Sequence, residues 1–201
     1  MKIYSEIDKT VDFSSKVILH YTGSMYGVGT FISNSMNIGR ISLNKCRTSK
    51  KGFIVLLSDI EDLNSHFLTV TKKIKRFLSH YWPGNLTLLL KSTTHIFSEV
   101  QMDGFIAVRV PKNKLLRELI RKYNTPFLST SINLTGATAE SNLDTIIQKY
   151  QKWFDCGVLS DRPKKVSSTP STIIKIFKNE IIPIRVGEIP IEDLEKTYQN
   201  I

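Results

Sequence analysis

The stretch FIAVRVPKNKLLRELIRKYNTPFLS, residues 105–129, holds a strand, a helix and a second strand in direct succession. Its first part is apolar apart from Arg109, as in strands that are covered on both faces. Apolar side chains then recur on one stripe of a helix, at Leu115, Leu116, Leu119, Ile120 and Tyr123. A second strand-like run follows at Phe127–Ser129. This succession predicts an α/β fold.

The same alternation runs through the rest of the chain. Further strands are predicted at 17–20, 53–57, 86–90, 172–177 and 181–185, and two further helical stripes lie within 70–81 and 143–150. No repeat, low-complexity tract or linker rich in proline and glycine divides the sequence. We therefore expect one α/β domain over residues 1–201.

The length and composition exclude several classes of protein. A chain of 201 residues fits one ordinary domain, and its 41% hydrophobic and 23% charged residues are typical of globular proteins rather than disordered or fibrous ones. No apolar run reaches the ~18 residues that a membrane span needs. Glu6 and Asp8 stand where a signal peptide would be apolar, so we expect a cytoplasmic protein.

Metal centres and disulfides are not expected. Cys46 and Cys156 lie too far apart for a metal-binding pair, and two cysteines in a chain without an export signal predict no disulfide framework. The histidines show no H-x-x-x-H spacing and have no nearby cysteine or paired carboxylates; they are His20, His66, His80 and His95. The sequence therefore predicts no metal ligands.

The net charge of +10 permits binding to nucleic acid or to a polyphosphate, because clustered cations concentrate anions. The excess is spread over both halves of the chain. Two interpretations stay open: selection for an anionic ligand, and a general bias of composition toward lysine and isoleucine. The run Lys72-Lys73-Ile74-Lys75-Arg76 opposes an apolar stripe, which favours a solvated helix face over an RNA contact.

Three polar loops lie beside predicted strands and could bind an anion. Tyr21–Gly29 has glycines that would let backbone amides approach a ligand, although it is neither a Walker loop nor a dinucleotide-binding fingerprint. Residues 44–52 place four cations before a strand, and residues 129–136 concentrate hydroxyl and amide side chains after one. Each loop has a plain alternative as a turn or solvated loop, and Arg109 can equally end in solvent or reach inward to an anion.

In order and spacing, these blocks resemble the YrdC-like family of threonylcarbamoyl-AMP synthases, which act in tRNA modification. The resemblance covers residues 17–189. It rests on blocks that are weak singly and specific in this order: Tyr21–Gly29, Lys45-Cys46-Arg47 with Lys51-Gly52, His80–Thr87, Ala107–Pro111, Ser129–Gly136, and Pro170–Ile174 with Arg185–Gly187.

The resemblance implies a fold and a reaction. The fold is a single domain with a twisted, mostly mixed β-sheet flanked by helices and a concave basic cleft, as in the short bacterial form. The reaction converts L-threonine, bicarbonate or CO₂, and ATP into threonylcarbamoyl-AMP and diphosphate, with Mg²⁺ bound mainly through the nucleotide phosphates. A separate tRNA threonylcarbamoyl transferase complex would then form threonylcarbamoyladenosine beside the anticodon.

The resemblance also implies roles for named residues. The expected ATP contacts belong to the family's signature cluster and its surroundings: Lys45, Arg47, Lys51, Ser129, Ser131, Asn133 and Arg185. The expected threonine contacts are Thr22, Arg109 and Ser171, and Arg109 can hold a carboxylate with two hydrogen bonds. Lys45 and Arg47 are the expected catalytic residues, because they would neutralise charge that develops on phosphate.

The chain departs from the family pattern at several positions. Tyr21 and Gly23 stand where the family prefers proline and glutamate, Thr48 where proline often follows the cationic block, and Asn113 where histidine is common. Gly23 matters most, because it removes the carboxylate of the loop.

Two other functions use the same residues. An RNA-binding module without catalysis could use the basic cleft, although the sequence lacks basic strands interleaved with aromatic residues. The same domain also occurs within larger maturation enzymes, but no acylphosphatase-like or zinc-finger segment is present here. We therefore expect the enzyme, with weak RNA binding and no membrane association.

Overall fold

The structure, a computed structural model, describes residues 2–46, 52–66, 70–91, 100–101, 103–160, 163, 166 and 169–201. In chain order, the strands are β1 (Lys2–Tyr4), β2 (Ile18–Tyr21), β3 (Tyr26–Phe31), β4 (Ile54–Leu56), β5 (Leu86–Lys91), β6 (Phe105–Arg109), β7 (Phe127–Ser131), β8 (Cys156–Val158), β9 (Thr172–Phe177) and β10 (Glu180–Arg185). The helices are α1 (Ser35–Asn44), α2 (Asp62–His66), α3 (Lys72–Ser79), α4 (Lys114–Tyr123), α5 (Leu143–Tyr150) and α6 (Ile191–Gln199), with a 3₁₀ turn at Gln151–Trp153.

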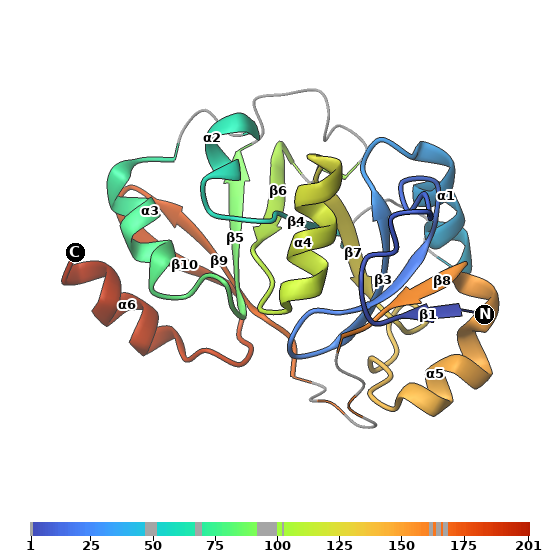
Figure 1. The fold of residues 1–201 in the computed structure, drawn as a ribbon. Helices are drawn as coiled ribbons and strands as arrows, with labels where there is room; N and C mark the ends of the chain where they lie inside the picture. Colours follow the sequence, from blue (N-terminus) through green and yellow to red (C-terminus); the bar gives the residue numbers. More distant parts are fainter. Residues whose placement is uncertain are drawn as a thin grey trace.

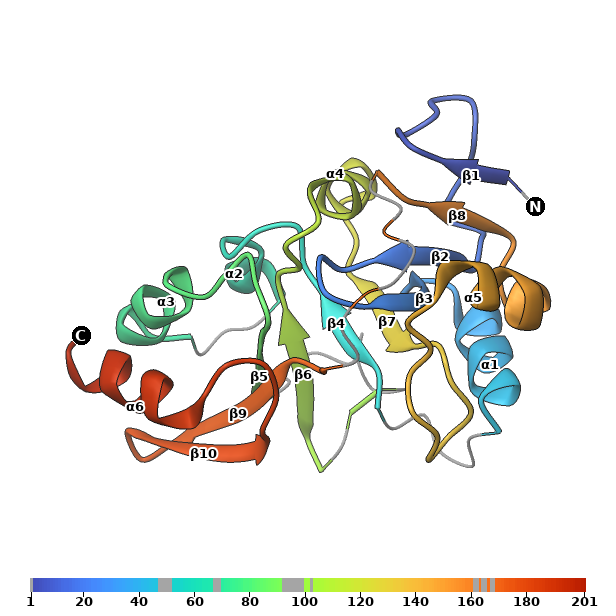
Figure 2. The ribbon, with the colours of Figure 1, turned by 90° about the horizontal axis from the view of Figure 1, so that it is seen from below.

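The described strands form one ten-stranded sheet in the order β1-β8-β2-β3-β7-β4-β6-β5-β9-β10. Strand β8 is parallel to both β1 and β2, β4 is parallel to β6, and β5 is parallel to β9, whereas the other neighbours are antiparallel. Figures 1 and 2 show the sheet twisting strongly from one end of the molecule to the other. The expected α/β fold with a twisted mixed sheet is confirmed.

Alternate residues of the middle strands supply two separate hydrophobic cores. Leu56 and Phe127 pack with helix α4, whereas their neighbours Val55 and Leu128 belong to a larger core that includes α1, α3, α5 and α6. Successive side chains of a strand point to opposite faces, so both faces of the sheet are covered here. This double burial explains why β4 is apolar throughout and why β7 begins with Phe127 and Leu128.

The two ends of the sheet carry different helices. Helices α3 and α6 lie side by side at the end with the C-terminus, where the ring centroids of Phe77 and Tyr198 are 5.3 Å apart (Figure 1). Helices α1 and α5 lie at the other end, near the N-terminus, and Arg40 of α1 forms a 2.8 Å ion pair with Asp155 just beyond α5. Within the described chain, no helix combines the length and apolar character needed to cross a membrane.

Candidate active site

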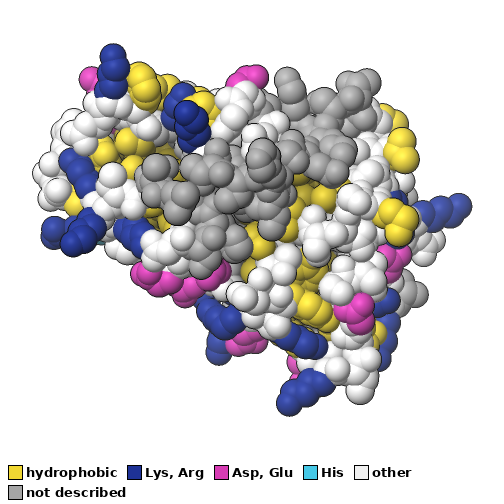
Figure 3. Space-filling model, turned by 90° about the horizontal axis from the view of Figure 1, so that it is seen from above, with side chains coloured by type: hydrophobic (Ala, Val, Ile, Leu, Met, Phe, Trp, Pro, Cys, Tyr) yellow, Lys and Arg dark blue, Asp and Glu magenta, His cyan; other side chains and the backbone are white. Residues whose placement is uncertain are grey.

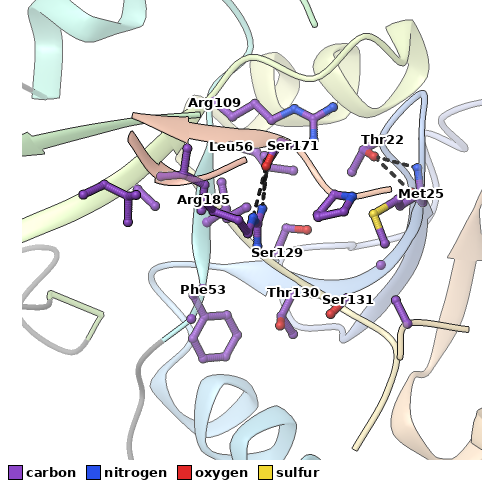
Figure 4. Close-up of a pocket in the computed structure, with 18 of the residues that line it drawn as sticks. Thr22, Met25, Phe53, Leu56, Arg109, Ser129, Thr130, Ser131, Ser171 and Arg185 are labelled. Atoms are coloured by element: carbon purple, nitrogen blue, oxygen red, sulfur yellow. Dashed lines mark hydrogen bonds between the residues drawn. The ribbon is translucent and has the colours of Figure 1, made fainter. Parts of the chain in front are cut away.

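A cavity of about 790 Å³ lies over one face of the middle strands. Its floor includes Ala107 of β6, Ile54 of β4 and Ser129 of β7. Ile54 is paired with both Ala107 and Ser129, so these side chains are neighbours on the same face of the sheet. The segment Pro170–Ser171 and strands β9 and β10 supply one wall (Figure 4). The topology thus brings together segments that are far apart in the sequence.

Arg109 is buried at the end of β6, with 4% of its surface exposed. Its Nε donates to the Gly84 carbonyl at 2.6 Å, and its Nη2 donates to Asn85 Oδ1 and to Ser24 Oγ at 3.5 Å. None of these bonds is made by Nη1. Burial lowers the pKa of Arg109 to about 10, and the Glu188 carboxylate opposes that shift, so the side chain stays cationic at neutral pH. Arg109 therefore reaches inward to the cavity rather than out to solvent.

Arg185 and Ser171 form a second polar group beside Arg109. Arg185 donates to the Ser171 carbonyl from Nε at 3.1 Å and from Nη2 at 2.9 Å, and Nη2 also donates to Ser171 Oγ at 3.1 Å (Figure 4). The Ser171 hydroxyl lies 2.8 Å from Thr87 Oγ1, and both groups are buried. Burial lowers the pKa of Arg185. We call Arg109, Ser171 and Arg185 the arginine wall.

Lys45 lies behind the opposite side of the cavity and is fully buried. Its Nζ donates to the Ser131 carbonyl at 2.5 Å, to the Asn133 carbonyl at 2.7 Å and to Asn133 Oδ1 at 2.9 Å. An ammonium has three N–H groups, so these bonds use all of them. Ser131 and Asn133 line the cavity, whereas Lys45 is not among its described lining residues. We call Ser131–Asn133, held from behind by Lys45, the Lys45 loop.

Thr22 lines the cavity from the turn between β2 and β3. Its backbone amide and its hydroxyl each donate to the Met25 carbonyl at 3.0 Å, which closes the turn (Figure 4). The next residue, Gly23, has φ +102°, and a Cβ there would lie 2.6 Å from the Lys112 Cβ. Gly23 lines a separate, more open hollow with Lys112 and Asn113 instead of the main cavity. Position 23 thus faces away from the arginine wall.

The structure brings most of the expected site residues together. Those that line the cavity are Thr22, Arg109, Ser129, Ser131, Asn133, Ser171 and Arg185. Lys45 touches two of them from behind. Arg47 and Lys51 lie outside the described residues.

Sequence reasoning gave no role to the side chains that orient Arg109. Asn85 accepts a hydrogen bond from Arg109 through Oδ1 and donates one to Glu188 through Nδ2, so it links the arginine to a carboxylate. Asn85 lies within the quoted block at 80–87, but its partner Glu188 is 103 residues away. His20, whose spacing from the other histidines predicts no metal site, is 2.8 Å from Ser129 Oγ. The sequence feature that could point to His20 is a polar residue at the end of the apolar strand predicted at 17–20.

The charge of the cavity is modestly positive. Its described lining includes the cations Arg109, Lys175 and Arg185 and the carboxylate Asp103. Among the described residues, no group of three His, Cys, Asp or Glu side chains could hold a metal ion. On the face shown in Figure 3, the visible Lys and Arg side chains are dispersed around the edge rather than gathered in one patch.

Comparisons with known proteins agree with the resemblance seen in the sequence. The model of the Sua5/YciO/YrdC family, described as telomere recombination, matches residues 14–187. A curated protein of Methanocaldococcus jannaschii is 30% identical over 183 residues, which cover 91% of this chain and 85% of its own. The threonylcarbamoyl-AMP synthase of Psychromonas ingrahamii is 27% identical, with 80% of this chain and 85% of its own covered. That of Bacillus subtilis is 26% identical over 90% of this chain, which spans 52% of the relative's length.

Solved structures share the fold. Pyrococcus abyssi Sua5, crystallised with L-threonine, superposes with a TM-score of 0.81 at 20% identity, over 98% of this chain and 61% of its own. Escherichia coli YciO superposes with a TM-score of 0.77 at 24% identity, over 90% of this chain and 87% of its own. Because the family model covers most of the sequence and the fold is the same, the protein belongs to the Sua5/YciO/YrdC family.

Proposed function

We propose that the protein is a threonylcarbamoyl-AMP synthase, which makes threonylcarbamoyl-AMP and diphosphate from L-threonine, bicarbonate or CO₂, and ATP. The observation that carries the proposal is one cavity with a buried, oriented cation at Arg109 and a loop of hydroxyl and amide groups opposite it. Relatives in Bacillus subtilis and Psychromonas ingrahamii carry the name of this activity. Pyrococcus abyssi Sua5 has been crystallised with L-threonine.

Threonine binds at Arg109 and Ser171 of the arginine wall in this proposal. Arg109 is held by Gly84 and Asn85 through Nε and Nη2, which leaves Nη1 for the carboxylate of the substrate. A cation held in place before the ligand arrives loses little entropy on binding, and its hydrogen bond to a carboxylate is strong. Thr22 and Ser171 are the proposed partners for the rest of the amino acid.

The nucleotide binds at the Lys45 loop. Ser131 donates to Asn133 Oδ1 at 2.6 Å, and Asn133 Nδ2 donates to the Leu134 and Ala137 carbonyls at 3.0 and 2.6 Å, so the loop is rigid. We propose that Lys45 serves catalysis through this loop. Arg47 and Lys51, outside the described residues, and Arg185 are the proposed phosphate contacts. A fixed loop positions the α-phosphate for attack.

The reaction needs position and charge more than a nucleophilic side chain. The amine of threonine loses protons and adds CO₂ to give a carbamate. A carbamate oxygen then bonds to the α-phosphorus, the bond from that phosphorus to the bridging oxygen of the β-phosphate breaks, and diphosphate leaves with the electron pair. Several anions meet in one cavity, so cations such as Arg109 and Arg185 stabilise the arrangement.

Mg²⁺ fits the site through the nucleotide rather than through a cage of side chains. The described lining offers the carboxylate of Asp103, which is available to bind a water of the ion. Mg²⁺ commonly keeps several waters and binds through substrate phosphates, where it neutralises their charge. The proposal therefore includes Mg-ATP as the form of the nucleotide.

The adenylate would pass to a separate tRNA threonylcarbamoyl transferase complex. Direct RNA binding is proposed to be weak, since the cations visible on the face in Figure 3 are dispersed, and dispersed cations favour nonspecific phosphate contacts that salt weakens. Residues 1–201 are proposed to act as one domain, because the sheet includes both β1 and β10.

The direct test mixes the purified protein with ATP, Mg²⁺, threonine and bicarbonate. We expect diphosphate release that depends on threonine and bicarbonate, together with threonylcarbamoyl-AMP detected by mass spectrometry. Arg121→Gln, on an exposed face of α4, is the control variant and should stay active, whereas Arg109→Gln should not. Absence of the adenylate, with a salt-resistant tRNA complex instead, would support the RNA-binding module.

A further inference from the structure

His20 reaches across a neighbouring strand to a residue of the cavity floor. It is fully buried on β2, and its Nε2 lies 2.8 Å from Ser129 Oγ on β7, although β3 lies between these strands. Gly27 of β3 makes this possible, because a Cβ there would lie 2.8 Å from Nε2. The ring of Phe127 packs edge-on against the imidazole, with centroids 5.2 Å apart. The imidazole is therefore fixed in position.

The surroundings of the ring decide which nitrogen carries the hydrogen. Nδ1 lies 3.3 Å from the Ile18 carbonyl oxygen, which can only accept a hydrogen bond. A neutral imidazole with its hydrogen on Nδ1 has a lone pair on Nε2. The Ser129 hydroxyl must then donate to Nε2. The lone pairs of Ser129 Oγ remain for a ligand in the cavity.

His20 is not a general base for a serine nucleophile. Burial, together with the charge of Arg109, lowers its pKa to about 4, so it gains no proton at neutral pH. Its Nδ1 faces a carbonyl instead of the carboxylate that orients the histidine of a catalytic triad. What the pair supplies is a hydroxyl oxygen with a fixed direction.

We propose that His20 is a positioning residue that makes Ser129 a hydrogen-bond acceptor for the N–H of threonine and of the carbamate formed from it. This rests on the proposed function. Figure 4 places Ser129 between the arginine wall and the labelled Thr130 and Ser131. In the carbamate, the N–H group lies between the carboxylate end and the oxygen that attacks phosphorus. An acceptor at this place favours an N–H group and repels carboxylate or phosphate oxygen, so it selects the orientation of threonine. Ser129 thus serves threonine rather than ATP.

Steady-state kinetics test this role. We expect Ser129→Ala and His20→Leu each to raise the KM for threonine about tenfold, with the KM for ATP unchanged, since a hydrogen bond to a charged amine is lost. The double variant should be no worse than either single one, because His20 acts through Ser129. His20→Gln, whose side-chain oxygen can accept from Ser129, should recover most of the loss. Equal KM values for threonine in wild type and Ser129→Ala would overturn the proposal.

A second measurement does not depend on the substrate. Long-range ¹H–¹⁵N correlation spectra of the imidazole should show hydrogen on Nδ1 of His20 at neutral pH, and an Nε2 shift that changes in Ser129→Ala. Hydrogen on Nε2 would overturn the proposal even in an active enzyme. A wild type that makes no adenylate would instead refute the proposed function and the carbamate role with it, while these spectra would still decide how Ser129 is oriented.

Discussion

Two sides of the same cavity use buried cations in different ways. On the Lys45 loop, the ammonium gives all three N–H groups to Ser131 and Asn133, so its charge holds the chain together. On the arginine wall, Arg109 is fixed through Nε and Nη2, and Nη1 makes none of these bonds. Burial alone therefore does not identify a cation that binds a ligand. A cation that binds a ligand is identified by N–H groups that make no hydrogen bond within the protein.

The largest expected effect is on stability, when the hydrogen bonds of Lys45 to its loop are removed. Lys45→Met keeps the length of the side chain and removes the ammonium, which leaves the partly buried carbonyl oxygens of Ser131 and Asn133 without this donor. We expect a loss of about 3–5 kcal/mol in the free energy of unfolding, measured with denaturant. Lys72→Met, on the exposed side of α3, is the matched control and should change little. Unchanged stability with lost catalysis would make Lys45 a direct phosphate ligand.

The pH dependence of stability tests the state of His20, which contacts Ser129 on the cavity floor between the two sides. The pKa of His20 is lowered from 6.5 to about 4 in the folded protein, chiefly by burial. Between these values the unfolded chain binds a proton that the folded chain does not, so stability falls as the pH falls through this range. The contribution amounts to about 3 kcal/mol. Between neutral pH and about pH 4, the free energy of unfolding should therefore fall more for the wild type than for His20→Gln. The same pH dependence in both proteins would contradict a buried, neutral His20.

Substitutions of Gly23 test whether the turn between β2 and β3 can carry the carboxylate that the family prefers at this position. The residue has φ +102°, and a Cβ would press against Lys112. Gly23→Ala should therefore cost about 1–2 kcal/mol in the free energy of unfolding. Gly23→Glu should be at least as unstable and should not increase adenylate formation. A more active Gly23→Glu enzyme would show that the side chain can turn into the main cavity.

The smallest effect concerns the orientation of Arg109. Glu188 is exposed and reaches the arginine through Asn85, so it contributes little on its own. Glu188→Gln keeps the shape and removes the charge. The KM for threonine should rise about two- to threefold at most, with the KM for ATP unchanged. If the KM for ATP rose instead, Glu188 would act on the nucleotide side of the cavity.

Local patterns predicted those strands that are apolar throughout. The strand at 172–177 also has the predicted bounds, because all of its residues except Lys175 are β-formers. The glycines of β3 predict a loop, but a Cβ at Gly29 would lie 2.2 Å from the Leu128 carbonyl oxygen, so glycine is needed there for close packing in a strand. Strands β1 and β8, with three residues each, are too short for periodicity. Helix α1 was missed because Met36 and Leu43 are exposed and blur its apolar stripe.

The site could be predicted as a set of residues but not as an arrangement. The order of motifs named Arg109, Ser131 and Asn133, which line one cavity. Their partners could not be predicted, since Asn85 meets Glu188 across 103 residues and His20 meets Ser129 across 109. The second pair depends on the register of β2, β3 and β7, and the first joins two segments that lie just outside strands.

Binding measurements on two variants test the central contrast most directly. Isothermal titration with threonine and with Mg-ATP, on folded Arg109→Gln and Lys45→Met, separates the two sides of the cavity, with Arg121→Gln as the control. We predict that Arg109→Gln loses threonine binding and keeps that of Mg-ATP, because it lacks the cation that would bind the carboxylate. Lys45→Met should weaken Mg-ATP and keep threonine, because its loop lies at the nucleotide. Equal losses of both ligands in both variants would contradict the division of the cavity into two sides.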